Sequence, residues 1–231
     1  MTTLIDLSKK AKVVLEKKQI FGEKAQVAVA LDISGSMSNL YSNGTVQELT
    51  NRLLGIGLNL DLDGSIDVYA FGANSYEVGT ATENNHNGFV SNMMKKFRLE
   101  YDTQYGGAMQ KIINKSTKKK GLGGLFGKKE VATEPTLVFF ITDGNNSDRA
   151  LAEKLIKESS DKAIFWQFVG IGHAGFQFLQ KLDDMSGRFL DNADFFRVED
   201  LRNVSDEDLY NSLLNEFPQW IKDARSKGIL K

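Results

Sequence analysis

Short apolar runs alternate with amphipathic segments along most of the chain. Residues 3–17 carry apolar side chains at helical spacing and predict an amphipathic helix. The next segment, residues 26–33 (QVAVALDI), is short, apolar and uninterrupted, which is typical of a strand buried on both faces of a parallel sheet. Residues 46–56 again show helical spacing, so the chain opens as helix, strand and helix.

The same alternation continues toward the carboxyl end. Further strands are predicted at 66–71, 76–78, 136–142, 163–169 and 195–198, and further helices at 89–97, 108–113, 149–159 and 176–182. A closing helix is predicted at 206–227, and Pro218 must kink or interrupt it because proline has no backbone N–H. This order predicts an α/β fold, Rossmann-like and doubly wound, with a mainly parallel central sheet and helices on both faces.

The length of 231 residues fits one domain, residues 1–231, with a core at about 26–198 and the terminal helices as extensions. One segment breaks the alternation. Residues 115–130 concentrate lysine and glycine and have no periodic apolar face, so they predict a flexible surface loop.

Composition narrows the class of protein. The 29 basic and 30 acidic residues nearly cancel, which argues against nucleic acid or an anionic membrane as the partner. The chain has no cysteine, so thiolate metal sites and cysteine nucleophiles are excluded. The first residues do not resemble a secretory signal, and no apolar run approaches the roughly 20 residues of a membrane span. We therefore expect a soluble, cytoplasmic protein; its oligomeric state is not indicated.

Oxygen-bearing side chains follow two of the predicted core strands. Asp32, Ser34 and Ser36 form a D-x-S-x-S turn directly after the first strand, and Asp143 with Gly144 follows the strand 136–142. Parallel strands bring their carboxyl ends to one edge of the sheet, where ligands bind in such folds. Hard cations such as Mg²⁺ prefer oxygen ligands in near-octahedral geometry. The sequence therefore predicts a cation site at this edge.

These residues resemble the metal-ion-dependent adhesion site of von Willebrand factor type A (VWA) domains. That site joins D-x-S-x-S, a threonine in a later loop and an aspartate before glycine, which here match Asp32, Ser34, Ser36, Thr103 and Asp143. The resemblance covers about 26–198 and implies the VWA fold. It also implies that these five residues hold Mg²⁺, with Ca²⁺ or Mn²⁺ as alternatives, and that a Glu or Asp carboxylate of a protein partner completes the coordination.

A narrower resemblance is to bacterial tellurium-resistance-type (Ter) VWA proteins. It is carried by the segments GSMSNLY, YGGAM and FFITDG. It implies a role in stress response or tellurite resistance. In this interpretation the protein is a binding module and not an enzyme.

Two other interpretations of the same residues stay open. Ser34 and Ser36 could simply cap a turn, and Asp143 could form an Asx-turn. Alternatively, Asp32 could be the nucleophile of a Mg²⁺-dependent phosphohydrolase of the haloacid-dehalogenase type, although Ser34 stands where that family needs a second aspartate. The joint occurrence of all three parts of the pattern favours the metal-dependent binding site.

Other motifs compete less well. Residues 170–175 fit G-x-G-x-x-G and Asp194 follows, but only one weak strand remains downstream for a dinucleotide-binding unit. A phosphate loop at 122–129 would need glycine in place of Leu122 and Ser or Thr in place of Lys129. Serine hydrolysis lacks the G-x-S-x-G turn, and only His86 and His173 could act as the base.

Overall fold

The computed structural model describes residues 2–118, 131–144 and 146–231. Within these ranges the strands are β1 (Gln26–Asp32), β2 (Ile66–Phe71), β3 (Ser75–Ala81), β4 (Thr136–Thr142), β5 (Ile164–Ile171) and β6 (Ala193–Val198). The α-helices are α1 (Leu4–Lys17), α2 (Ser38–Ser42), α3 (Thr45–Leu60), α4 (Phe89–Lys96), α5 (Gly106–Lys118), α6 (Arg149–Ser159), α7 (Gln177–Asp183), α8 (Asp206–Leu213) and α9 (Phe217–Ser226). Two 3₁₀ turns, η1 (Gly35–Met37) and η2 (Leu201–Asn203), complete this part of the chain.

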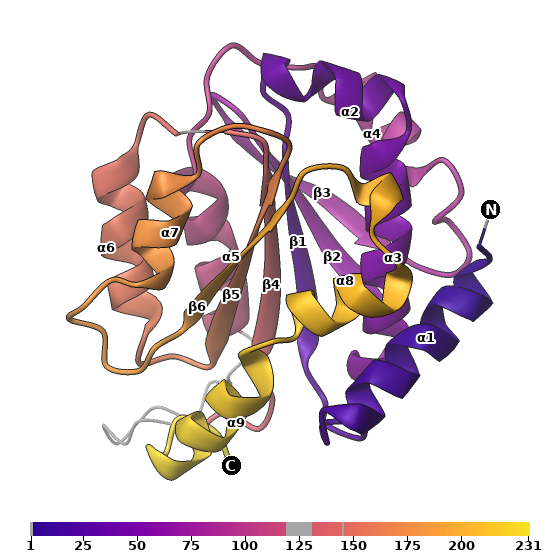
Figure 1. The fold of residues 1–231 in the computed structure, drawn as a ribbon. Coiled ribbons are helices and arrows are strands. Elements are labelled where there is room, and N and C mark those ends of the chain that lie inside the picture. Colours follow the sequence, from indigo (N-terminus) through magenta and orange to yellow (C-terminus); the bar gives the residue numbers. More distant parts are fainter. Residues whose placement is uncertain (1, 119–130, 145) are drawn as a thin grey trace.

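The described strands form one sheet in the order β3-β2-β1-β4-β5-β6, seen in Figure 1. Only the β2–β3 pair is antiparallel; β1 pairs in parallel with both β2 and β4, and β5 and β6 continue in parallel. The chain leaves β1 toward β2 and later returns to the other side of β1 with β4. The predicted doubly wound, mainly parallel sheet is therefore confirmed.

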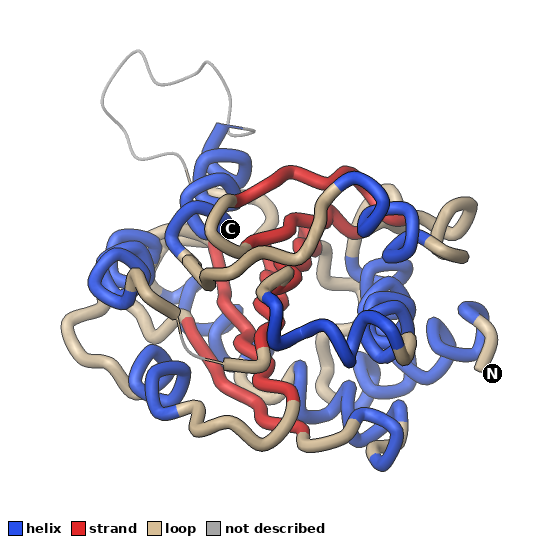
Figure 2. Tube along the Cα trace, turned by 90° about the horizontal axis from the view of Figure 1, so that it is seen from above, coloured by secondary structure: helices blue, strands red, loops and turns tan. Residues whose placement is uncertain are grey.

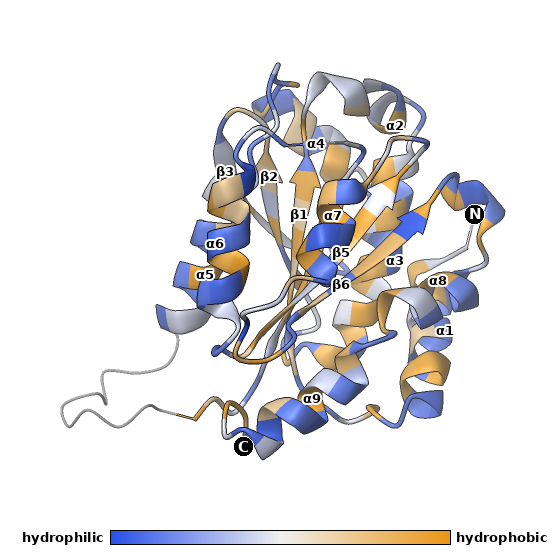
Figure 3. Ribbon diagram, turned by 60° about the vertical axis from the view of Figure 1, so that its left-hand side comes forward, coloured by the Kyte–Doolittle hydropathy of each residue, from blue (hydrophilic) through white to orange (hydrophobic). Residues whose placement is uncertain are grey.

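Helices cover both faces of the sheet, as the view from above in Figure 2 shows. Along β1, Val27, Val29 and Leu31 pack into the core formed with α1, α3, α8 and α9, whereas Ala28 and Ala30 join the core under α5, α6 and α7. Successive residues of a strand point to opposite faces, so a strand covered on both sides must be apolar throughout. The apolar strands between polar helix surfaces are visible in Figure 3.

Several predicted boundaries are wrong. The helix predicted at 206–227, which Pro218 was expected to kink or interrupt, is two helices, α8 and α9; the break precedes Pro218, which lies in the first turn of α9, where its missing N–H costs no hydrogen bond. Residues 115–118, predicted as loop, are the last turn of α5; residues 119–130 of that predicted loop lie outside the described residues. The short strand predicted at 76–78 is the longer edge strand β3. No helix in the described ranges combines the length and apolarity needed to cross a membrane.

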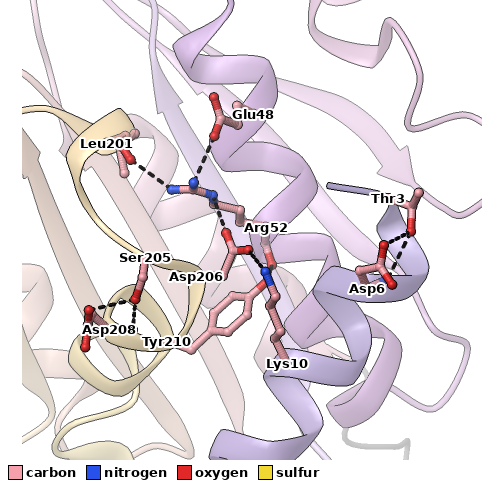
Figure 4. Close-up of polar contacts among 10 residues, drawn as sticks. All are labelled: Thr3, Asp6, Lys10, Glu48, Arg52, Leu201, Ser205, Asp206, Asp208 and Tyr210. Carbon is pink, nitrogen blue, oxygen red and sulfur yellow. Dashed lines mark hydrogen bonds and ion pairs between the residues drawn. The ribbon is translucent and has the colours of Figure 1, made fainter. Parts of the chain in front are cut away.

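The helices near the two ends of the chain are joined by a buried charge network (Figure 4). Asp206 at the start of α8 pairs with Arg52 Nε of α3 at 2.9 Å and with Lys10 Nζ of α1 at 2.6 Å. Arg52 also donates to the Leu201 carbonyl at 3.1 Å and pairs with Glu48 at 2.9 Å. The side chains of Arg52 and Asp206 are only 10% and 6% exposed. This network fixes α1 and α8 on α3.

A glycine allows these three helices to approach closely. A Cβ added at Gly55 of α3 would lie 2.9 Å from the Tyr210 hydroxyl of α8 and 3.1 Å from the Leu7 backbone of α1. Only hydrogen fits in that space. The Tyr210 hydroxyl donates to the Arg52 carbonyl at 3.1 Å. The close approach at Gly55 and the charge network at Arg52 therefore lie on the same turn of α3.

Replacing Arg52 by methionine keeps most of the side-chain volume but leaves the buried Asp206 with Lys10 alone. Because an incompletely compensated buried charge is costly, we expect the free energy of unfolding to fall by about 3 kcal/mol in urea denaturation. Arg202→Met is the control, since that arginine is 69% exposed and pairs with Asp200 at 2.8 Å. It should cost less than about 1 kcal/mol. An equal decrease in the free energy of unfolding in Arg52→Met and Arg202→Met would contradict a structural role for the buried network.

Candidate metal centre

Asp32 and Asp143 lie at neighbouring strand ends. Asp32 is the last residue of β1, Asp143 directly follows β4, and the two strands pair in parallel up to Leu31 opposite Ile141. The edge lies beside α2 in Figure 1. In the sheet order, β1 is the strand at which the chain reverses its direction of winding, and such a switch point leaves a crevice outside the strand ends.

Asp32 is fully buried, and both of its carboxylate oxygens accept hydrogen bonds. Ser34 N donates to Oδ1 at 2.7 Å, and the Thr142 hydroxyl of β4 donates to Oδ2 at 2.6 Å. The Tyr41 hydroxyl donates to the Asp32 backbone oxygen at 2.8 Å. These contacts fix the orientation of the carboxylate, so Asp32 is a rigid part of the turn.

Four of the five predicted site residues form one chain of contacts. Ser34 Oγ lies 3.0 Å from Ser36 Oγ, and Ser36 Oγ donates to Asp143 Oδ1 at 2.8 Å. With the bond from the Ser34 backbone N–H to Asp32, these contacts join the two strand ends. Ser36 is exposed and Asp143 is half-buried, so the chain runs from the interior to the surface.

Bonds of its backbone hold Thr103 against the loop that follows Asp143. Ser147 N, in the loop after Asp143, donates to the Thr103 carbonyl at 2.9 Å, and Thr103 N donates to Asp102 Oδ1 at 2.8 Å. Among the described residues, the Thr103 hydroxyl makes no hydrogen bond with the other four site residues. The structure therefore brings four predicted residues together and holds the fifth in the adjoining loop.

Burial perturbs both carboxylates. The pKa of Asp32 is raised to about 6, chiefly by burial and further by the negative charge of Asp143, while hydrogen bonds from Thr142 and Ser34 oppose the shift. Burial also raises the pKa of Asp143, against the hydrogen bond from Ser36. No lysine or arginine among the described residues is a main contributor to either shift. A divalent cation would supply the missing positive charge.

The donor set fits a hard cation. It consists of two carboxylates and neutral hydroxyls, the oxygen ligands that Mg²⁺, Mn²⁺ and Ca²⁺ accept. In the loop after Asp143, the buried Asn146 Oδ1 has no hydrogen-bond partner among the described residues, which is unusual for an interior amide. Both observations are compatible with an ion and its bound waters in this crevice.

Three supporting residues were missed from the sequence. Thr142 orients Asp32, Tyr41 holds its backbone, and the backbone of Glu100 pairs with both sides of the D-x-S-x-S turn. In that pairing Glu100 N donates to Ile33 O and Gly35 N donates to Glu100 O, each at 2.8 Å. The only signal for Thr142 was its place at a buried strand end, and nothing local in the sequence marked Glu100.

The competing motifs lose support. Gly170 and Ile171 belong to β5, and a Cβ at Gly170 would lie 2.8 Å from the ring of Phe176, so that glycine serves packing. His173 is 80% exposed beside Glu199, and His86 Nδ1 lies 3.4 Å from Asn51 Oδ1. Neither contact involves the serines of the D-x-S-x-S turn. The proposed phosphate loop lies outside the described residues.

Comparison with known proteins gives both a family and a fold. A family model described as "vWA found in TerF C terminus" matches residues 24–230. A relative from Bacillus subtilis (strain 168), named "Uncharacterized protein YcbR", is 38% identical over 229 residues, which span 98% of this chain and 90% of the relative.

Solved structures with similar folds are much more distant in sequence. The VWA domain of SpRpn10 is 14% identical with a TM-score of 0.54, covering 81% of this chain and 94% of that one. The manganese-loaded Plasmodium vivax TRAP protein is 15% identical with a TM-score of 0.58, covering 85% and 74%. At these identities the likeness concerns the fold alone.

A second group of carboxylates lies away from this crevice. Asp183 at the end of α7, Asp194 in β6 and Glu216 between α8 and α9 have carboxylate oxygens within 4.8 Å of one another. Burial, followed by the charges of Asp194 and Glu216, raises the pKa of Asp183 to about 7. Asp194, which the sequence placed after the G-x-G-x-x-G segment, therefore belongs to this acidic cluster.

This cluster predicts a pH dependence of stability. Between the ordinary aspartate pKa of 3.8 and about 7, the folded chain keeps a proton on Asp183 that the unfolded chain releases. The free energy of unfolding should therefore fall as the pH rises through this interval and level off above it. Because Asp183 is partly exposed, we expect a contribution of only about 1–2 kcal/mol.

Urea denaturation between pH 4 and pH 8 measures this slope, and Asp183→Asn should make it less steep. Asp200→Asn is the control, because a hydrogen bond from Arg202 lowers the pKa of Asp200. An unchanged slope in Asp183→Asn would show that the cluster is not the source of the pH dependence.

Proposed function

The chain belongs to the vWA-TerF-like family, and from that premise we propose that it binds one divalent cation and uses it to recognise a carboxylate on a protein partner. VWA domains often bind metal and mediate protein interactions. The proposed ligands are Asp32, Ser34, Ser36, Thr103 and Asp143. The observation that carries the proposal is the series of short contacts that joins Asp32 to Asp143: the Ser34 backbone N–H to the Asp32 carboxylate, the Ser34 hydroxyl to the Ser36 hydroxyl, and the Ser36 hydroxyl to the Asp143 carboxylate.

Mg²⁺ is the proposed ion. Hydroxyl and carboxylate oxygens suit a small hard cation that keeps some of its waters. The manganese-loaded state of the Plasmodium vivax TRAP protein supports divalent metal binding within this fold. Mn²⁺ and Ca²⁺ are alternatives, because the same oxygen atoms accept both.

An outside carboxylate is the proposed final ligand because of charge and geometry. Two aspartates nearly neutralise the ion and the three hydroxyls add no charge, so a rearrangement that loosens one aspartate would strengthen the attraction of the ion for an outside carboxylate. The aspartates act directly or through a bound water, and the five side chains together leave a position of an octahedron open for an outside group. The exposed side of Ser36 gives a partner access to that position.

The phosphohydrolase alternative receives less support. A nucleophilic aspartate must reach the phosphorus atom, whereas Asp32 is fully buried and both of its oxygens accept hydrogen bonds. The general acid that this chemistry needs two residues later is replaced by Ser34. Recognition is therefore the function that the geometry supports best.

The family description and the sequence resemblance support a wider context. We propose that the protein acts in the cytoplasm in bacterial stress response, of which tellurite resistance is the example suggested by the Ter-type resemblance. In that setting the metal site would join the protein to another component in a metal-dependent way.

Calorimetric titration with Mg²⁺ and Mn²⁺ tests the metal site. The double variant Asp32→Asn with Asp143→Asn keeps the shape of both side chains but removes both charges, and it should bind at least 100-fold more weakly. Asp200→Asn, which changes a carboxylate at η2, should bind as the wild type does. Wild-type affinity in the double variant would refute the proposed ligands.

The carboxylate preference has its own test. Acetyl-glutamate amide should shift the backbone NMR signals of Ser36 and Thr103 at millimolar concentration with Mg²⁺ present, and EDTA should abolish the shifts. Acetyl-glutamine amide is the matched control, since it lacks only the charge. Equal shifts with the two compounds would argue against recognition of an acidic group.

A further inference from the structure

The loop that carries Thr103 is fastened to the loop that carries Asp143 by one aspartate. Asp148 Oδ1 accepts a hydrogen bond from Tyr105 N at 2.8 Å, and Asp148 Oδ2 accepts one from Gly106 N at 2.7 Å. Gly106 is the first residue of α5, and the first N–H groups of a helix have no partner within the helix. Asp148 thus caps α5 from a segment more than 40 residues later in the chain.

Ser147 adds further bonds between the same loops. Its backbone N donates to the Thr103 carbonyl at 2.9 Å, and its hydroxyl donates to Asp102 Oδ2 at 3.0 Å. We call the contacts of Ser147 and Asp148 with residues 102–106 the loop brace. Each residue from 102 to 106 except Gln104 is bonded to this brace, so the backbone of Thr103 is held on both sides.

The packing around the brace leaves no room for a side chain at position 106. A Cβ at Gly106 would lie 2.8 Å from Asp148 Oδ2 and 2.3 Å from Leu151 Cδ2, so only glycine lets the start of α5 reach the carboxylate. Asn146 Nδ2 donates to Asp148 Oδ1 at 2.9 Å and fixes the orientation of that carboxylate. The brace is therefore a specific contact between the two loops.

Thr103 depends on this brace more than the other site residues do. Asp32, Ser34, Ser36 and Asp143 bond to one another, whereas in the described part of the chain Thr103 is bonded only through its backbone. This inference rests on the metal site proposed above. We propose that Asp148 is a positioning residue. It does not contact the ion but sets the distance between the Thr103 hydroxyl and the ion. Replacing a residue that hydrogen-bonds to a metal ligand commonly lowers the affinity for the metal by about 10- to 100-fold.

Asp148→Asn tests this role, because it keeps the size of the side chain but leaves one carbonyl oxygen for two N–H groups. In calorimetric titration with Mn²⁺ we expect the dissociation constant to rise about tenfold. Thr103→Ala should weaken binding on its own. If Asp148 acts through Thr103, adding Asp148→Asn to Thr103→Ala should produce no further loss, since the two effects share one cause.

A remote helix cap separates this role from general destabilisation. The Ser205 hydroxyl accepts a hydrogen bond from Asp208 N at 3.1 Å and caps α8. Ser205→Ala should lower the thermal unfolding temperature of the metal-free protein, as loss of a cap does, without changing the Mn²⁺ dissociation constant. Asp148→Asn should change both quantities.

The outcomes distinguish this inference from the proposed function. Two results would overturn the positioning role alone. One is a wild-type Mn²⁺ affinity in Asp148→Asn. The other is a full tenfold loss of affinity when Asp148→Asn is added to Thr103→Ala. Absence of Mn²⁺ binding in the wild type, or unchanged binding in the Asp32→Asn and Asp143→Asn double variant, would overturn the metal site and the inference with it.

Discussion

The parallel pairing of β1 with β4 is the constraint on which the rest of this structure depends. Residues 26–31 pair with residues 136–141, so the two strands end level with each other in the middle of the sheet. That register brings Asp32 and Asp143 together although both are acidic and burial raises the pKa of both. Two carboxylates in one buried crevice are costly, and hydroxyl donors from Thr142 and Ser36 offset part of the cost.

The central position of β1 and β4 also requires helices on both faces of the sheet. A strand that is apolar on both sides must be covered on both sides, and α5, α6 and α7 supply one cover. On the other face, α1 and α8, from opposite ends of the chain, pack against α3 and meet at Asp206. On the face covered by α5, α6 and α7, the helices α5 and α6 lie side by side, and the loop brace joins the segments at which these two helices begin. The same layers thus bury the core and bring the site loops together.

Much of the fold and part of the site followed from local patterns. The uninterrupted apolar runs identified the central strands because burial on both faces leaves no polar position, and the D-x-S-x-S turn was recognisable because its three side chains lie within five residues of one another. The edge strand β3 and the division between α8 and α9 were predicted poorly. Edge strands tolerate polar residues, and a proline fits the start of a new helix as well as it interrupts an old one.

By itself, the sequence determined the class of fold and the central strands, and its resemblance to VWA domains indicated the five residues proposed as metal ligands. Only the tertiary structure decided how those residues are supported. Asp148 looks like any surface aspartate in the sequence, and its partners Tyr105 and Gly106 lie more than 40 residues earlier. Hydrophobic periodicity is a local property, so it can be read from neighbouring residues, whereas a hydrogen bond between two loops exists only once the strands beneath them have paired.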